Sequence, residues 1–343
     1  MDISVIVPTY NRAGLIEETL HSIVSQTLRP AQVIVVDDGS QDHTERVVRD
    51  FGRSAEYLRI ENSGECRARN VGVQASSATW VAFCDSDDLW RPDKLMRQAE
   101  LLEKAPDVEY CFTNFAVVTA SGWSATTKFD SAPAGYWELP RRQLGPDLLV
   151  VEGSMFEKLL VHQPIFPSTL LMRRSFFERV GRWNEPLGRT PSVDLEFHLR
   201  CVADGRVGVV SAPVAGIRKH GGNFSGNPLR TTVGEVAILR YVLEHHRAAQ
   251  GYAAAIGEQI KARCAMAAEG AFAAGNFALV RELLAGVPPK QRSRQLRMKS
   301  RIARLPAPLG RAARSMAVNA RQLLSTVRPG FGTGQGSEAH RRG

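Results

Sequence analysis

Three carboxylates crowd into the four positions Asp85-Ser86-Asp87-Asp88, directly after the apolar run Trp80-Val81-Ala82-Phe83. An apolar run of this kind predicts a buried strand, so the acids lie where that strand leaves the sheet. Neighbouring carboxylates repel one another unless solvent or a cation screens them, and oxygen ligands suit Mg²⁺ or Mn²⁺ completed by substrate phosphates. The same residues also fit an ordinary turn followed by a helix N-terminus. The four residues alone leave both interpretations open.

Two further predicted strands also end in polar residues. Residues 3–7 form a β-branched run that stops at Pro8 and leads into Thr9-Tyr10-Asn11-Arg12, while residues 32–36 end in Asp37-Asp38-Gly39-Ser40. Strands of this kind alternate with helical patterns over the first hundred residues, which predicts an α/β fold with right-handed βαβ units and a mostly parallel sheet. In such sheets ligands bind beyond the carboxyl ends of the strands, where these polar residues converge.

Neither G-x-x-x-x-G-K-[ST] nor G-x-G-x-x-G follows a predicted strand. A bound nucleotide must therefore be held by acids and a metal rather than by a glycine-rich cradle.

The middle of the chain is less regular. We expect strands over residues 110–113, 167–173, 207–210 and 214–217, and irregular structure over residues 118–150. The periodicity of residues 192–203 leaves helix and strand both open.

Four motifs follow one another along the first ninety residues: Val5-Ile6-Val7-Pro8-Thr9-Tyr10-Asn11, Val35-Val36-Asp37-Asp38-Gly39-Ser40, Asn62-Ser63-Gly64 with Ala68-Arg69-Asn70-Val71-Gly72, and Asp85-Ser86-Asp87-Asp88. In order and spacing they resemble the family 2 glycosyltransferases, and the resemblance covers about residues 2–225. It implies a GT-A (Rossmann-like) fold and inverting transfer of a sugar from a nucleotide donor, most often UDP-linked.

On the donor side, the resemblance implies that Asp38 hydrogen-bonds the base and that Pro8-Thr9-Tyr10 lines the nucleotide pocket. Asp85 and Asp87 match the family's Asp-x-Asp pair, which contacts the ribose and the diphosphate-bound metal. Asp87 is ranked first as a metal ligand, ahead of Asp85 and Asp88.

On the acceptor side, Asp194 is similar to the aspartate that serves as general base, although Val193 stands where the family usually has Glu. His220, within Arg218-Lys219-His220-Gly221-Gly222-Asn223, is similar to the histidine that approaches the metal and diphosphate. A sugar hydroxyl is a poor nucleophile, so a carboxylate must take its proton as the glycosidic bond forms. The departing nucleoside diphosphate gains negative charge that a divalent metal can neutralise.

Composition sets wider limits. The 343 residues are 43% hydrophobic and 23% charged, as in soluble globular proteins. Met1-Asp2-Ile3-Ser4-Val5 lacks the basic start and apolar core of a signal peptide, so we expect a cytoplasmic protein. The five cysteines are scattered and indicate reduced, mostly buried thiols rather than disulfides or a zinc site.

The net charge of +9 belongs to the C-terminal end: residues 290–343 hold 13 basic residues and one acid, Glu338, against 31 basic and 34 acidic residues before them. We expect a GT-A domain over residues 1–228, a basic helical region over 229–327 and a disordered tail over 328–343. The basic helices fit either an anionic membrane surface or simple solvation, and no specific nucleic acid is expected because aromatic residues are not interleaved.

The sequence thus predicts a metal-dependent inverting glycosyltransferase that acts on a glycan or lipid-linked acceptor in cell-envelope polysaccharide biosynthesis, at the inner face of a membrane. The alternative is a nucleotide-sugar binding or scaffold protein of the same fold whose acceptor site has decayed, as Val193 could indicate.

Overall fold

The computed structural model describes residues 1–221, 226–306 and 308–316. Within these residues the strands form one mixed sheet of eleven strands, and β1 lies in its interior. The sheet order is β3-β2-β1-β4-β10-β6-β11-β9-β8, with β5 paired to β11 and β7 to β6. The strands β3, β2, β1, β4, β6 and β11 run in one direction, and β10 runs against them between β4 and β6. The expected α/β architecture with a mostly parallel core is therefore present. The strands are β1 Ile3–Thr9, β2 Gln32–Asp37, β3 Glu56–Arg59, β4 Trp80–Phe83, β5 Leu89–Trp90, β6 Tyr110–Thr119, β7 Gly122–Thr127, β8 Arg141–Gln143, β9 Leu148–Val151, β10 Leu170–Arg173 and β11 Val207–Arg218.

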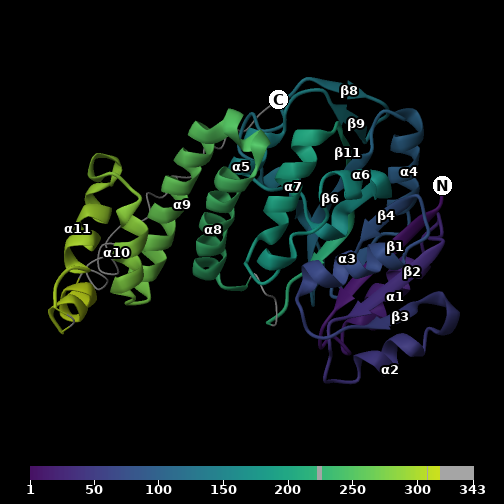
Figure 1. Ribbon diagram of the computed structural model, residues 1–343, viewed down its shortest axis with the longest axis horizontal. Helices are drawn as coiled ribbons and strands as arrows, with labels where there is room; N and C mark the ends of the chain where they lie inside the picture. Colours follow the sequence, from purple (N-terminus) through teal and green to yellow (C-terminus); the bar gives the residue numbers. More distant parts are fainter. Residues whose placement is uncertain (222–225, 307, 317–343) are drawn as a thin grey trace, which may run out of the picture. The chain divides into compact units, whose positions relative to one another are not determined.

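Helices pack on both faces of this sheet (Figure 1). Successive residues of a strand point to opposite faces, so Val5 and Val7 join one apolar cluster with α1, α2 and α4, while Ile6 joins another with α3 and α5 to α8. Burial on both faces explains why the central strands are continuous apolar runs. The helices are α1 Ile16–Val24, α2 Thr44–Arg49, α3 Glu65–Ala75, α4 Lys94–Lys104, α5 Phe156–Val161, α6 Arg174–Arg179, α7 Val193–Asp204, α8 Pro228–His245, α9 Ala253–Ala273, α10 Phe277–Ala285 and α11 Arg294–Ile302.

Pro8 belongs to a central strand although proline lacks the backbone N–H of a ladder. The pairing of β1 with β4 ends at Ile6 and Phe83, two residues before Pro8, so β1 meets only β2 at that point. The proline therefore lies where the two strands diverge and the polar loops begin.

Three expectations for the middle of the chain need correction. Residues 118–150 are not irregular, because they contain the end of β6 and the strands β7, β8 and most of β9. Residues 207–217 form one strand, β11, whose pairing with β6 shifts on either side of Pro213. The predicted strand at 167–173 is a 3₁₀ turn, Pro167–Thr169, followed by the shorter strand β10. The open question at residues 192–203 is resolved as a helix, α7.

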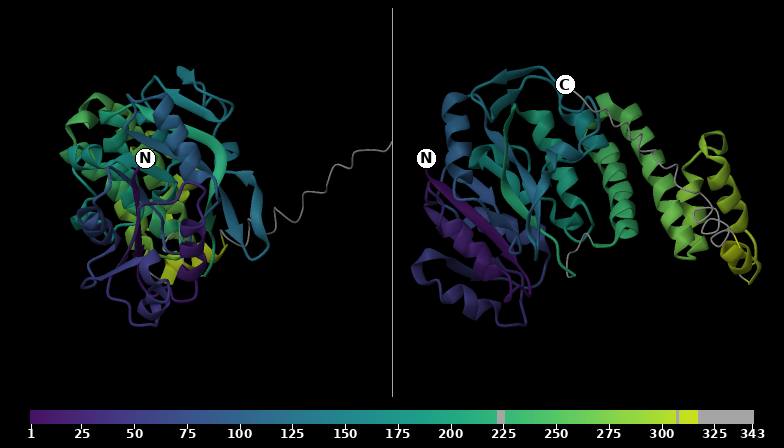
Figure 2. Two further views of the ribbon diagram at one scale, coloured as in Figure 1. Left: turned by 90° about the vertical axis from the view of Figure 1, so that its right-hand side faces the viewer. Right: turned by 180° about the vertical axis from the view of Figure 1, so that it is seen from behind.

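The chain divides into two compact units, Met1–Arg263 and Cys264–Gly343, with the division inside α9. In the second unit α10 and α11 pack side by side (Figure 2), and residues 308–316 are helical. The rest of the helix expected at 309–327, and the tail at 328–343, lie outside the described residues. The predicted domain limits at 228 and 327 stay predictions.

Among the described residues, no helix is both long and apolar enough to cross a bilayer. All five cysteines are buried and free, as the sequence indicated.

Candidate active site

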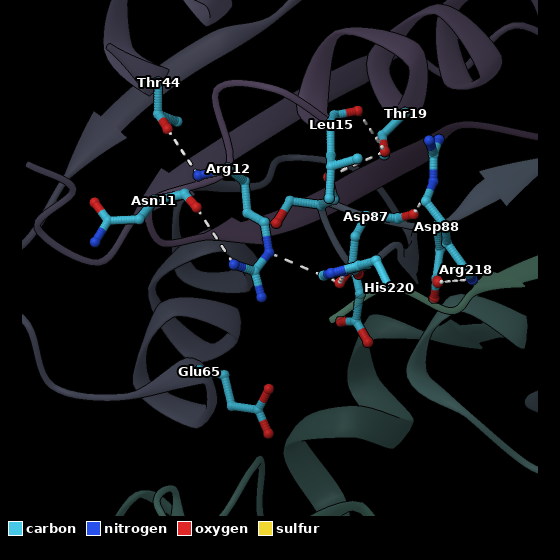
Figure 3. Close-up of polar contacts among 12 residues, drawn as sticks. Asn11, Arg12, Leu15, Thr19, Thr44, Glu65, Asp87, Asp88, Arg218 and His220 are labelled. Atoms are coloured by element: carbon cyan, nitrogen blue, oxygen red, sulfur yellow. Dashed lines mark hydrogen bonds and ion pairs between the residues drawn. The ribbon is translucent and has the colours of Figure 1, made fainter. Parts of the chain in front are cut away.

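Asp87 and His220 meet at the carboxyl edge of the sheet. Asp87 follows β4 and His220 follows β11, and His220 Nε2 lies 2.9 Å from Asp87 Oδ2. Arg12, in the loop after β1, brings its Nε to 3.7 Å from the same oxygen. Figure 3 shows these three side chains directed toward one another. Residues that are far apart in sequence thus form one charged cluster where three parallel strands end.

The position of Asp87 is fixed through its backbone. Arg218, at the end of β11, donates from Nε to the Asp87 carbonyl oxygen at 2.8 Å and from a terminal nitrogen to Glu18 of α1 at 2.9 Å. These contacts fix the backbone of Asp87 and do not use its carboxylate, which instead faces His220 and Arg12.

Asp85 is paired with a buried arginine. Arg69 of α3 is 1% exposed, donates to Asp85 Oδ1 at 2.8 Å and to Glu65 at 3.2 Å, and its guanidinium lies 4.8 Å from the Trp183 ring centroid. Burial raises the pKa of the Asp85 carboxyl, and the charge of Arg69 opposes that rise. Among the described residues, Arg69 Nε and Nη1 are buried without a hydrogen-bond partner. The buried guanidinium of Arg69 thus keeps a positive charge next to Asp85, and removing that charge from water costs free energy of desolvation.

Asp88 serves as a buried anchor. Ser168 Oγ donates to one carboxylate oxygen at 2.5 Å, and the Arg218 backbone N–H donates to the other at 3.0 Å. The same serine hydroxyl accepts the Asp85 backbone N–H at 2.9 Å. Burial raises the pKa of Asp88 well above its ordinary value, with the charges of Asp85 and Asp87 adding to the effect. With both oxygens bonded to protein, Asp88 joins the β4 loop to β11, and its assignment as a metal ligand stays a prediction.

The predicted nucleotide-pocket residues lie at the ends of β1 and β2. The Asp38 carboxylate accepts the backbone N–H groups of Ser63 at 2.7 Å and Gly64 at 2.9 Å, which fixes the loop before α3. Tyr10 is 43% exposed, an aromatic side chain open to solvent at this edge, whereas Thr9 is buried with its hydroxyl unbonded among the described residues. The structure brings these residues together, and their roles toward a base stay predictions.

Asp194 stands in the first turn of α7. The residue before the helix, Ser192, has φ of 64°, a left-handed conformation that costs a non-glycine residue about 1 kcal/mol. A helix N-terminus favours a carboxylate, yet burial raises the pKa of Asp194 to about 7, helped by the negative charges of Glu65 and Asp85 and opposed by Arg69. Desolvation therefore outweighs the helix dipole. Asp194 is a carboxyl that both binds and releases a proton near neutral pH, within electrostatic reach of the Asp85 pair.

Gln163, from the loop after α5, contacts the Asp194 carboxylate. Its Nε2 donates to Asp194 Oδ2 at 2.9 Å and lies 3.5 Å from His198 Nδ1. Burial lowers the pKa of His198 to about 3, so this imidazole is neutral at physiological pH. The amide therefore orients the carboxylate without a competing positive charge from His198.

Val193 occupies an apolar place. It is 2% exposed and belongs to the core cluster beneath α7. The acid two residues beyond Asp194, Glu196, is also buried, but it binds Arg200 at 2.8 Å and His246 at 2.8 Å and ties α7 to α8. Glu196 therefore does not stand in for the acid that the resemblance implied at position 193, and Gln163 is a polar side chain that contacts Asp194.

Sequence reasoning missed four residues of this site: Glu65, Arg69, Gln163 and Ser168. Arg69 lay within a recognised motif, and its position one helical turn after Glu65 could have indicated the pair. Gln163 and Ser168 carry no local signal, because they reach the site through the long connections before α7.

A divalent cation fits the donor set at Asp87. Among the described residues, no group of three or more His, Cys, Asp or Glu side chains is arranged to enclose a metal. Asp87 and His220 nevertheless offer a carboxylate and an imidazole, and Mg²⁺ is commonly bound by one or two carboxylates with substrate phosphates and water completing its shell. These two side chains would hold part of the shell of a divalent cation, and a diphosphate would supply the rest.

Residues 4–156 match the family model described as Glycosyl transferase family 2. An uncharacterized glycosyltransferase of Rickettsia conorii is 31% identical over 205 residues, which are 59% of this chain and 32% of that protein. TuaG of Bacillus subtilis, a glycosyltransferase named for teichuronic acid biosynthesis, is 35% identical over 135 residues, which are 38% of this chain and 53% of TuaG. The matches thus span about a third to just over half of these relatives.

The fold is similar to that of S. aureus TarS. The crystal structure of TarS residues 1–349 in complex with UDP-GlcNAc has a TM-score of 0.61 at 19% identity, with 94% of this chain and 92% of that chain covered. At this identity the likeness concerns the fold, a sheet flanked by helices with helical sequence after it. The family match shows that residues 4–156 are similar to the family 2 glycosyltransferases, and the structural likeness shows that the chain has a GT-A fold.

Proposed function

We propose that this protein transfers a sugar, with inversion, from a UDP-linked donor to a hydroxyl group of a glycan or lipid-linked acceptor. The observation that carries the proposal is Asp194: a carboxyl with a pKa of about 7, in electrostatic contact with the Asp85–Arg69 pair at the carboxyl edge of the sheet. A base of this pKa accepts a proton and later releases it to water near neutral pH.

The donor would lie along the ends of β1, β2 and β4. In this proposal the exposed Tyr10 stacks on the base, Asp38 fixes the loop before α3, and Asp85 accepts from the ribose hydroxyls; the exposure of Tyr10 and the hydrogen bonds of Asp38 and Asp85 support these roles. The UDP-GlcNAc in the TarS complex supports a UDP-linked donor for this chain too. A hexosyl or N-acetylhexosaminyl group is the proposed cargo.

The transfer is one displacement. The acceptor hydroxyl attacks the anomeric carbon while its proton passes to the Asp194 carboxylate, and the bond from the anomeric carbon to the diphosphate oxygen breaks with its electron pair leaving on UDP. Gln163 holds the carboxylate toward the acceptor. One displacement inverts the anomeric centre and needs no enzyme nucleophile. A divalent cation held by Asp87 and His220 would neutralise the charge that develops on the diphosphate.

The alternative of a decayed scaffold depended on Val193. Because Val193 is a core residue and Gln163 contacts the base directly, the site retains an oriented carboxylate without the missing Glu. This geometry favours an active enzyme.

The test is release of UDP from UDP-GlcNAc and UDP-glucose by wild type and by Asp194→Asn. We expect the variant to lose about 10²- to 10⁴-fold in turnover, the range of general-base catalysis, and to keep its affinity for UDP. The matched control is Asp204→Asn, the same change at the far end of α7, where the carboxylate is exposed and pairs with Arg179 at 3.0 Å. Wild-type turnover in Asp194→Asn would remove the base from the mechanism, and UDP binding without any turnover by wild type would favour the scaffold.

The acceptor and place of action are also proposals. The name of TuaG supports a cell-envelope polysaccharide as the product. We propose that the protein works in the cytoplasm, which cell fractionation would test.

A further inference from the structure

The outward face of α11 carries a row of arginines. Arg294, Arg297 and Arg301 follow the i, i+3, i+7 spacing that places side chains on one side of a helix, and all three are exposed. Two more exposed arginines, Arg304 and Arg311, follow within the described residues. Three exposed arginines thus share one side of α11, and two more lie in the described residues that follow it.

Large apolar side chains are exposed among these arginines. Met298 is 45% exposed, Leu305 43%, Leu309 59% and Met316 72%. Single exposed apolar residues are ordinary on protein surfaces, but four within nineteen residues, each next to or near an arginine, are not. We call the exposed residues Arg294, Arg297, Met298, Arg301, Arg304, Leu305, Leu309, Arg311 and Met316 the basic–apolar face.

The other side of α11 is already packed. Leu296 is 3% exposed, Ser300 is 9% exposed, and Lys299 is 7% exposed with its Nζ 3.5 Å from Glu269 and over the Phe272 ring. The helix start is fixed by Ser293, whose hydroxyl accepts the Leu296 N–H at 3.1 Å. The packing of α11 therefore uses its buried side, and the exposed apolar side chains are not among the residues of that side.

The sequence around this face holds no acid. Between Glu282 and Glu338 there is neither Asp nor Glu, so this stretch of sequence carries no acid to offset its arginines. A surface of this sign attracts a polyanion, and each basic residue near an anionic bilayer contributes about 1 kcal/mol to binding.

We propose that the basic–apolar face binds the surface of an anionic lipid bilayer. Arginine side chains would contact the phosphate headgroups while Met298, Leu305, Leu309 and Met316 enter the boundary between headgroups and acyl chains. RNA, the other common polyanion, is bound through basic grooves with aromatic side chains for stacking, and the exposed large apolar residues of this face are Met and Leu. The mixture of charge and aliphatic surface therefore fits lipid. The proposal does not depend on the sugar-transfer chemistry.

The experiment is co-sedimentation of the 343-residue protein with vesicles of pure phosphatidylcholine and with vesicles containing one third phosphatidylglycerol. Wild type should bind only the anionic vesicles, and binding should weaken as salt rises. Arg297→Gln/Arg301→Gln/Arg304→Gln should lower the partition coefficient by about tenfold or more at low salt. Met298→Ser/Leu305→Ser should also weaken binding while leaving its salt dependence in place.

The matched control for charge is Arg29→Gln/Arg53→Gln/Arg240→Gln, which removes three exposed arginines from the first unit and should bind vesicles as wild type does. Equal loss in this control, or equal binding to the neutral vesicles, would overturn the proposal. A third outcome would also overturn it: Met298→Ser/Leu305→Ser leaves vesicle binding unchanged, and the protein retains a labelled RNA at physiological salt. That result would make the basic–apolar face a nucleic-acid surface. Because all substituted residues are exposed, thermal unfolding midpoints should stay within a few degrees of wild type.

Discussion

At the scale of single residues, the proposed chemistry depends on four aspartates whose burial and charged neighbours differ. Asp85 pairs with Arg69, Asp88 is bonded on both oxygens, Asp87 faces His220, and burial raises the pKa of Asp194 to about 7. Carboxyls of one type thus receive different environments, which is how a protein separates a base from a binding group.

The pH dependence of turnover follows from Asp194. Burial raises its pKa to about 7, and only the ionised carboxylate can accept the acceptor's proton, so the active fraction falls as pH drops below 7. We expect kcat to be level at about pH 8 and to fall roughly tenfold per pH unit below about pH 7. A pH–rate profile with saturating donor measures this. A rate that stays constant down to pH 5 would contradict the assignment.

Gln163→Leu tests whether the amide positions this base. Loss of an N–H donor to a carboxylate disfavours the ionised form, so the pKa of Asp194 should rise further and the acid limb should move to higher pH. Turnover should fall several-fold at pH 7 and recover largely at pH 8.5. Gln250→Leu, an exposed glutamine, is the control. An unmoved acid limb with a uniform loss of rate would assign Gln163 a structural role only.

Most of the proposed donor-side residues could be predicted because they follow strands directly. Asp38, Asp85 and Asp87 are placed by short loops, so a strand pattern is enough to locate them. Gln163 and Ser168 could not be predicted, because their positions depend on how the segment from α5 to β10 folds back over the sheet. For the same reason, Val193 alone was a poor guide to whether the site is weakened. The hydrogen bond to Asp194 comes from Gln163, in a loop that is distant in sequence.

At the scale of elements, local patterns identified the first four strands and their helices but not the sheet's later half. Residues 118–150 are rich in Gly and Pro, which predicted loops, yet they pair as β7, β8 and β9 through contacts made by β6 and β11. The Pro213 that separated two expected strands is accommodated by a shift in register. Tertiary pairing overrode local propensity in both cases.

Gly72→Ala tests the packing of α3, the helix that carries Glu65 and Arg69. A Cβ at this position would lie 2.3 Å from Ile6 Cγ2 and 3.2 Å from Val36 Cγ2, so α3 must move away from β1 and β2. We expect a loss of about 1–3 kcal/mol in the free energy of unfolding, measured by urea denaturation. Gly257→Ala, in α9 with nothing within 4 Å, should instead be neutral or stabilising. Equal stabilities for the two variants would contradict the close helix–strand packing.

At the scale of the whole molecule, the two structural units of the chain also differ in their net charge. The unit Met1–Arg263 contains the sheet and the proposed site, whereas the unit from Cys264 onward carries the excess of basic residues. The sequence indicated the basic C-terminal end through composition, while the predicted domain limit at residue 228 stays a prediction. It could not locate the division inside α9, because a continuous helix shows no break in pattern where the contacts around it change.

The central claim is that the carboxyl edge of the sheet binds a nucleoside diphosphate through a metal at Asp87. Isothermal titration of UDP, GDP, CDP and TDP, each with and without Mn²⁺, tests this on wild type, on Asp87→Ala and on Asp50→Ala, an exposed acid after α2. We predict Mn²⁺-dependent binding of UDP that weakens at least about tenfold in Asp87→Ala and is unchanged in Asp50→Ala. Absence of binding by every nucleotide, or UDP binding that depends on neither metal nor Asp87, would contradict the account.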